Sequence, residues 1–173
     1  MRRKPDAAGD AVDEHFGSAL AFLRALWELN HALERASRAM KRRLGVTGPE
    51  RLFIRVVGRL PGTTPARVAD ILRVDRSSVT PLLKRLERRR LVSREPVESD
   101  RRSVRLYLTG AGARIDAMKR GTIEAAVTEI LAGSARRHVE VTASTLGRIA
   151  RQLLEKTSRE DGRRVRVVRE RSR

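Results

Sequence analysis

The 173-residue sequence contains no cysteine, and this absence excludes several classes of site at once. Disulfides, cysteine zinc ribbons, thiol nucleophiles and thiol redox sensors all require that residue. Aromatic residues are also scarce, at 3% of the chain. That is too few for the base-stacking platforms with which proteins bind single-stranded nucleic acids.

Long apolar runs are missing as well. The charged content of 35% is too high for a membrane protein. The first residues, Met1 to Asp13, are charged and have no apolar core of the kind found in a signal peptide. We therefore expect a soluble protein without a membrane partner, located in the cytoplasm and associated with the nucleoid.

Acidic residues are in the minority, with 21 Asp and Glu against 39 Lys and Arg, which gives a formal net charge of +18. Such an excess is the electrostatic footprint of a protein that binds a polyanion. Together with the shortage of aromatic residues, it favours double-stranded DNA as the partner. The chain length and the 40% hydrophobic content fit one compact domain with helical extensions.

Residue combinations typical of enzymes and metal sites are not found. The three histidines, His15, His31 and His138, have no cysteine beside them and would need acidic co-ligands to hold zinc. Solvated or capping histidines explain them better. No nucleophile–base pair and no phosphate-binding glycine loop stands out. We predict no catalytic residue, no metal and no cofactor.

Four helices are predicted in the first half of the chain. Apolar residues recur at steps near 3.6 between residues 16 and 44, which indicates a long amphipathic helix. The run Thr47-Gly48-Pro49-Glu50 is typical of a capping box, so a second helix begins there and ends near Leu60. Thr64 opens a short third helix, and Asp75 can cap a fourth. One stripe of the fourth helix carries four apolar residues, Val79, Leu82, Leu83 and Leu86.

After Arg90 the apolar pattern changes from a helical period to a period of two. Residues 91–96 form a short extended run, and apolar residues alternate with polar ones over residues 104–108. A polar tip at residues 98–102 separates the two runs. This pattern predicts an antiparallel hairpin, and three short helices followed by a hairpin form a winged helix-turn-helix.

Two further amphipathic helices are predicted after the hairpin. Thr109 caps the first, which runs to Ile130, and the second follows Gly133. Both helices, like the first helix, carry more apolar surface than a winged domain can cover, so a partner subunit is expected to bury it. The fold class is therefore mainly α with a small β-hairpin wing, in four parts: an N-terminal dimerisation helix (12–44), the winged helix-turn-helix DNA-binding domain (47–109), C-terminal dimerisation helices (110–156) and a basic, mobile tail (157–173).

One segment resembles a known family. Residues 73–113, RVDRSSVTPLLKRLERRRLVSREPVESDRRSVRLYLTGAGA, resemble the MarR family of bacterial transcription regulators, and the flanking long helices fit that family. Within the segment, SVTPLLKRLE at residues 78–87 is most similar to the branch that senses organic hydroperoxides. The sensing cysteine of that branch has no counterpart here. The resemblance implies a homodimer on an inverted repeat of double-stranded DNA that acts as a repressor. Because the chain has no thiol, we expect any control to come from a non-covalent small-molecule effector or from protein abundance.

The fourth helix has the composition of a major-groove reader. Burial of its apolar stripe turns a polar face outward, on which Arg76 and Lys84 can donate to guanine and Thr80 can bond a base edge or a phosphate. Pro81 predicts a bend or a tightened turn, and its ring offers an apolar surface to a thymine methyl. The alternative is a solvated basic face. The predicted DNA-binding residues of this helix are Arg76, Ser77, Ser78, Thr80, Pro81, Lys84, Arg85 and Arg88.

The hairpin tip carries a second DNA-binding motif. Asp100-Arg101-Arg102 matches the Asp-any-Arg wing signature of the MarR family, which implies that an arginine enters the minor groove and that Asp100 holds the hairpin or the arginine in place. A guanidinium suits a narrow groove because it is weakly hydrated and the negative potential is concentrated there. Either arginine can be the inserted one, and the position in the motif favours Arg102. A purely structural charged turn is the alternative.

The resemblance also implies a ligand crevice between the dimerisation helices and the winged domain. Leu26, Trp27, Asn30 and Phe53 would line it, although all four suit a core position equally well. Asn30 lies in the apolar register of the first helix and can instead fix the register of a dimer. A competing function is that of an architectural DNA-binding protein, in which the same basic dimer coats DNA with little sequence preference and no effector.

Overall fold

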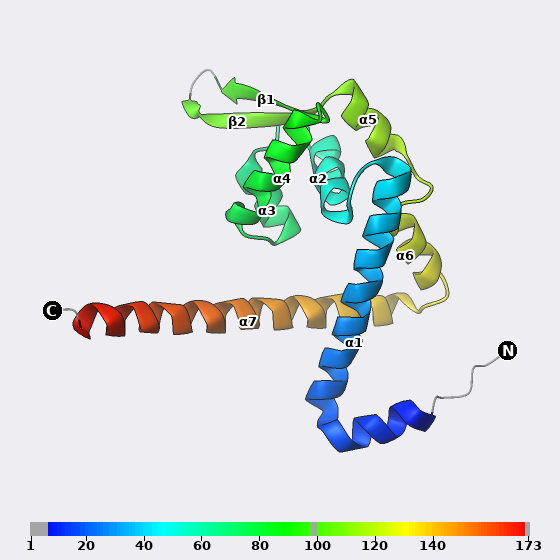
Figure 1. Cartoon of the computed structure of the whole chain (residues 1–173). Helices are drawn as coiled ribbons and strands as arrows, with labels where there is room; N and C mark the ends of the chain where they lie inside the picture. The colour runs from blue at the N-terminus through cyan, green and yellow to red at the C-terminus, as the bar shows by residue number, and fades with distance from the viewer. Residues whose placement is uncertain (1–6, 98–99, 172–173) are drawn as a thin grey trace. The chain divides into compact units, whose positions relative to one another are not determined.

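The computed structural model describes the backbone of residues 7–97 and 100–171, and side chains over residues 17–96, 103–157 and at residue 159. The chain divides into two compact units, Met1–Ala126 and Val127–Arg173. The described part is mostly helical, as predicted. Its elements are α1 (Ala7–Leu44), α2 (Gly48–Arg59), α3 (Pro65–Leu72), α4 (Arg76–Arg88), β1 (Val92–Val97), β2 (Asp100–Leu108), α5 (Gly110–Ala117), α6 (Ile123–Leu131) and α7 (Arg136–Arg171) (Figure 1).

Helix α1 is longer than predicted and is interrupted. It begins at Ala7 rather than at residue 12, and Gly17 inside it has φ 70° and ψ 164°, angles that glycine adopts without a steric penalty. The helix ends as expected at Leu44. Gly45 follows with φ 75°, and its amide donates to the carbonyl of Lys41 at 2.9 Å.

The predicted capping box at the start of α2 is present. The amide of Thr47 donates to Glu50 Oε2 at 2.8 Å, and the amide of Glu50 donates to Thr47 Oγ1 at 3.4 Å. Helix α3 is capped by Thr64, whose Oγ1 accepts from the amide of Arg67 at 3.2 Å. Local sequence therefore determines where both helices begin.

The hydrophobic core lies in the winged helix-turn-helix, inside the first unit. Helices α2, α3 and α4 each contribute one apolar stripe, and the base of the hairpin closes the core from the other side. The predicted stripe of α4 is buried in full. The residues of this core are Val46, Phe53, Ile54, Val57, Val68, Ala69, Val79, Leu82, Leu83, Leu86, Leu91, Val92 and Leu106.

The predicted hairpin is confirmed, and it has an additional partner that the sequence did not reveal. Strands β1 and β2 pair antiparallel, with a register irregularity between Pro96 and Val97. In the loop before α3, the amide of Gly62 donates to the carbonyl of Leu106 at 2.9 Å, and the amide of Leu106 donates to the carbonyl of Thr63 at 2.8 Å. The wing is therefore attached to the helix-turn-helix through the backbone of β2.

The helix predicted from Thr109 to Ile130 is not continuous, which corrects the sequence analysis. It breaks after Ala117, and α6 starts at Ile123. Gly121 adopts φ 74°, and Thr122 Oγ1 accepts from the amide of Ala125 at 3.2 Å as a new helix cap. A glycine in the left-handed conformation followed by a capping threonine ends one helix and starts another.

The predicted tail also differs from expectation. Helix α7 belongs to the second unit and continues through residue 157 as far as Arg171. Arginine and glutamate are good helix formers, and each added residue extends an existing helix at little cost. In the part of the chain that the structure describes, none of the helices combines the length and the apolar character needed to cross a membrane.

Candidate nucleic-acid interface

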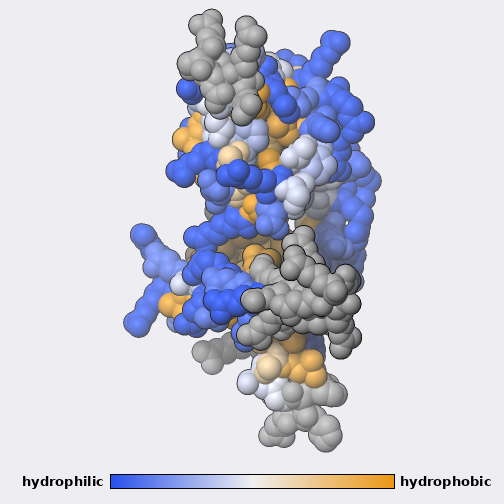
Figure 2. Space-filling model, turned by 90° about the vertical axis from the view of Figure 1, so that its left-hand side faces the viewer, coloured by the Kyte–Doolittle hydropathy of each residue, from blue (hydrophilic) through white to orange (hydrophobic). Residues whose placement is uncertain are grey.

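Helix α4 presents a polar face outward, opposite its buried stripe. The surface on the left of Figure 1, where α3, α4 and the hairpin lie, is mostly hydrophilic (Figure 2). The structure leaves every predicted DNA-binding residue of α4 exposed. These residues are Arg76, Ser77, Ser78, Thr80, Pro81, Lys84, Arg85 and Arg88.

One local expectation for α4 needs correction. Asp75 occupies the N-cap position, but its side chain makes no capping hydrogen bond and is exposed, where water competes for the carboxylate. The helix runs from Arg76 to Arg88 with Pro81 inside it, and the bend expected at Pro81 stays a prediction. Thr80 Oγ1 donates to the carbonyl of Arg76 at 3.1 Å, so part of its hydrogen-bonding capacity is used inside the helix.

The side chain of Arg85, on the polar face of α4, forms an ion pair with a residue of α2. Its Nε lies 4.0 Å from Oε1 of Glu50, a carboxylate that is only 3% exposed. Arg89 binds the same carboxylate, with Nη1 3.4 Å from Oε2, and its Nη2 donates to the carbonyl of Gly45 at 2.6 Å. The capping residue of α2 thus also holds the C-terminal half of α4 against the turn between α1 and α2. The capping role of Glu50 follows from the local sequence, whereas its ion pairs with Arg85 and Arg89 depend on how distant segments pack.

The angle between α4 and the wing is held by an ion pair that the sequence analysis did not identify. Arg94 on β1 donates to Glu87 on α4 through two bonds, Nε to Oε1 at 2.8 Å and Nη2 to Oε2 at 3.0 Å. This two-bond geometry fixes orientation as well as distance. Glu87 therefore acts as a positioning residue, because it links the helix that faces outward to the strand that leads to the hairpin tip.

The hairpin tip holds the second predicted motif. Asp100, Arg101 and Arg102 begin strand β2, where Asp100 pairs with Val97 in the register. The side chains of these three residues lie outside the described ones. The choice between Arg101 and Arg102 as the inserted arginine stays a prediction.

The structure places the four residues of the predicted ligand crevice at different depths, and the crevice itself stays a prediction. Phe53 is 0% exposed and belongs to the core of the winged domain. On α1, Trp27 is 72% exposed and stacks on His31, with ring centroids 6.1 Å apart. Asn30 is also exposed, and its Nδ2 donates to Glu34 at 3.2 Å. Leu26 is half-buried. Phe53 is therefore a core residue, and the structure does not bring these four side chains to a common surface.

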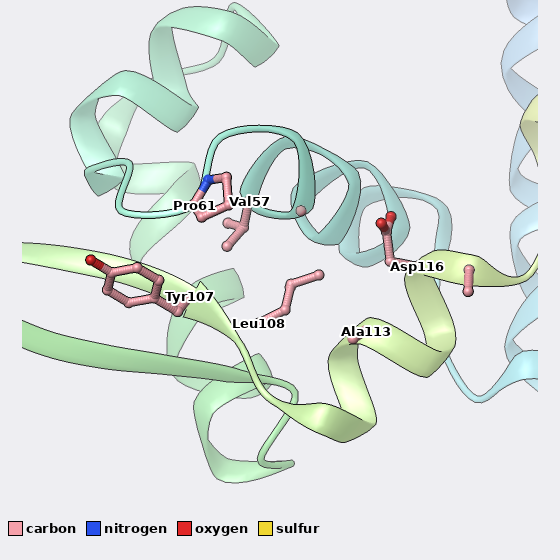
Figure 3. Close-up of a pocket in the computed structure, with 8 residues that line it drawn as sticks. Val57, Pro61, Tyr107, Leu108, Ala113 and Asp116 are labelled. Atoms are coloured by element: carbon pink, nitrogen blue, oxygen red, sulfur yellow. The ribbon is translucent and has the colours of Figure 1, made fainter.

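A different pocket, of about 320 Å³, lies between the end of α2, the base of β2 and α5 (Figure 3). Its wall is mainly apolar and includes one acidic side chain, that of Asp116. Nη1 of Arg55 on α2 lies 2.8 Å from Oδ1 of this carboxylate. The residues around the pocket are Val57, Gly58, Pro61, Tyr107, Leu108, Ala113, Asp116 and Ala117. Among the described residues there is no cluster of three or more side chains suited to hold a metal ion.

Comparison with known proteins gave consistent matches. Residues 23–103 match the model of the MarR family. The organic hydroperoxide resistance transcriptional regulator of Bacillus subtilis is 34% identical over 71 residues, which cover 41% of this chain and 48% of that protein. The match thus spans about half the length of that curated relative.

Solved structures of similar fold cover a larger share of the chain. FabT of Streptococcus pneumoniae in complex with DNA is 27% identical with a TM-score of 0.60, covering 80% of this chain and 99% of that one. PcaV of Streptomyces coelicolor in complex with its natural ligand is 23% identical with a TM-score of 0.61, covering 75% and 89%. The fold described above is therefore the fold of these regulators.

Proposed function

We propose that the chain, whose residues 23–103 match the model of the MarR family, is a transcriptional regulator of that family that binds double-stranded DNA in a sequence-specific manner. The observation that carries the proposal is the exposed polar face of α4, set opposite a fully buried stripe and held to the wing by Glu87 and Arg94. A helix of this shape fits the major groove, and donors such as Arg76 and Lys84 suit guanine edges. The similarity to a regulator solved on DNA supports the same function.

The active form that we propose is a homodimer on an inverted repeat. Apolar side chains remain exposed along the outer helices, among them Trp27 on α1 and Ile130 on α6, the latter 75% exposed. Leu153 and Leu154 on α7 are exposed as well. Apolar surface of this extent is stabilised by burial at about 25 cal/mol per Å². A two-fold dimer would place its recognition helices about 34–36 Å apart, on half-sites one DNA turn from each other.

Control by a non-covalent small molecule is the third part of the proposal. The chain offers no thiol for covalent control. The pocket between α2, β2 and α5 adjoins the base of the wing at Tyr107 and Leu108, so that a ligand bound there would act on the strand that positions the hairpin. Release of a repressor from its operator is the simplest outcome of such a movement.

Selection of bound sequences from a random pool of duplexes tests the proposal. A regulator enriches one inverted repeat, and a footprint on that repeat then shows protection of two half-sites. An architectural DNA-binding protein, the competing function, enriches no common sequence and protects any duplex uniformly.

A further inference from the structure

An apolar groove lies between α2 and α3, and we propose that it binds the acidic arm, residues 7–16, of a second copy of this chain. The inference rests on the proposed homodimer, to which it adds a further contact. The groove has a volume of about 270 Å³. The residues that line it are Leu52, Arg55, Val56, Arg59, Leu60 and Ile71.

The wall of the groove is apolar and open to water. Leu52, Val56 and Leu60 recur at four-residue steps along α2 and its C-cap, and Ile71 on α3 lies opposite. Leu52 is 53% exposed, and Leu60 and Ile71 are 45% and 38% exposed. Each of these side chains would gain from burial, so the groove suits a partner with an apolar row of its own.

Two arginines, four residues apart on α2, border the apolar row. Arg55 is already paired with Asp116. Arg59 is exposed, and in the part of the chain that the structure describes it forms no ion pair. Arg59 therefore offers a positive charge beside an apolar row, and the matching partner is an amphipathic helix with acidic residues on its flank.

The acidic arm has this complementary pattern. It lies within residues 5–23, the longest stretch without Lys or Arg in a chain of net charge +18. Asp10, Asp13 and Glu14 follow the i, i+3, i+4 spacing that places residues on one face of a helix. A row at four-residue steps, on another face of that helix, is apolar. It consists of Ala8, Val12 and Phe16.

A break in α1 separates the acidic arm from the rest of the helix. Gly17 has φ 70° and ψ 164°, which are not helical angles and which favour glycine. A Cβ atom added there would have no other atom within 4 Å. The arm therefore leaves the axis of residues 18–44, and Figure 1 shows this change of direction near the start of α1.

The length of α1 assigns the groove to a second copy. Helices α2 and α3 lie near the C-terminal end of α1, and the arm lies at its opposite end (Figure 1). Helix α2 begins at Gly48, whose amide donates to Ser37 Oγ at 2.8 Å. Ser37 is about 30 Å from Gly17 along the helix, whereas the arm spans only about 15 Å. The arm therefore does not reach the groove of its own chain, and a two-fold dimer would exchange the two arms reciprocally.

Engineered cysteines test this contact directly, because the chain has none of its own. Two full-length versions that differ in an affinity tag are co-expressed, one with Val12→Cys in the arm and one with Leu60→Cys in the groove. We expect mild oxidation to link the two versions, since a disulfide forms only when the two Cα atoms approach within about 7 Å. Ser77→Cys, at an exposed position on α4, replaces Leu60→Cys as the matched control and should give no link. If Leu60→Cys unfolds, Leu52→Cys takes its place.

A charge swap then tests what the groove recognises. An exposed ion pair contributes up to about fivefold in affinity, and a reversed charge replaces the attraction by repulsion. Arg59→Glu in the groove version should therefore slow linking by about five- to tenfold, and Asp13→Arg/Glu14→Arg in the arm version should do the same. The two changes together should restore the rate. Arg114→Glu, the same change at an exposed position on α5, should leave it unchanged.

The outcomes separate this contact from the proposed function. A wild-type protein that sediments as a monomer at micromolar concentration would overturn the proposed homodimer. A dimer that gives no link, an equal link to the α4 control, or a rate that the charge swap does not change would overturn only the arm and its groove. A version with both cysteines that links within one chain would overturn the second copy as the source of the arm.

Discussion

Arg51 supplies the sharpest stability prediction, because one buried side chain joins α2 to the end of α5 and to α6. Replacement by methionine keeps much of the volume and removes every donor. The carbonyls of Ile115 and Met118 lose the donor that Arg51 supplies, and Glu124 loses its ion pair with Arg51. An unsatisfied buried acceptor costs about 1–3 kcal/mol, and loss of one partner of a buried ion pair costs about 3–5 kcal/mol.

The structure places the expected value at the low end of that range. The side chain of Glu124 is 40% exposed and can be hydrated once Arg51 is replaced. Met118 is exposed as well, so water can reach the end of α5. We therefore expect Arg51→Met to lower the free energy of unfolding by about 3 kcal/mol, a large share of the roughly 5–15 kcal/mol that holds a domain together.

Urea unfolding followed by circular dichroism measures this loss, at two protein concentrations so that dimerisation is separated from folding. Glu124→Gln is the control, because it removes only the exposed partner and leaves Arg51 bound to both carbonyls. It should cost about 1 kcal/mol or less. If Arg51→Met lowers the free energy of unfolding by less than about 0.5 kcal/mol, the hydrogen bonds of Arg51 do not hold the turn between α5 and α6 in place.

Four further predictions concern DNA binding. Glu87→Gln should weaken operator binding in a fluorescence anisotropy titration, because Arg94 and the wing lose their anchor; tighter binding would mean that the removed negative charge matters more than the position of the wing. Arg102→Ala should cost about 1–3 kcal/mol of operator affinity without affecting dimerisation. Asp100→Ala should also weaken binding. A gain in affinity for Asp100→Ala would contradict the anchoring role that the family resemblance implies. Hydroperoxide should not release the protein reversibly, since the chain has no thiol; a gel shift that shows release at low micromolar oxidant and full recovery with dithiothreitol would contradict this.

Local sequence accounts for the elements whose causes lie within a few residues. The capping box at Thr47 and Glu50, the stripe on α4 and the alternating pattern of β2 each act over less than four turns of helix or one strand. Such short-range signals suffice for the winged helix-turn-helix and for the exposed face of α4. Gly121 and Thr122 carry a local signal of the same kind, for the end of one helix and the start of the next. The apolar periodicity of the residues around them concealed it.

Those short-range patterns do not predict contacts between segments that are distant in the sequence. Arg51 meets residues more than 60 positions away, and nothing in its neighbourhood distinguishes it from the other arginines of a basic chain. The pairing of Glu87 with Arg94 and the bridge from Thr63 to Leu106 likewise depend on how the elements pack. The sequence spacing of Phe53 suited a crevice and a core position equally well, and the structure places it in the core.

The proposed function requires that α4 and the wing read a DNA sequence, and the ratio of two affinities shows whether they do. Fluorescence anisotropy at physiological salt would compare the selected inverted repeat with a scrambled duplex of the same length and composition. A sequence-specific regulator binds its site at least about a thousandfold more tightly than other DNA. We predict a ratio of that order, whereas affinities within about tenfold of each other would contradict the account and support an architectural protein.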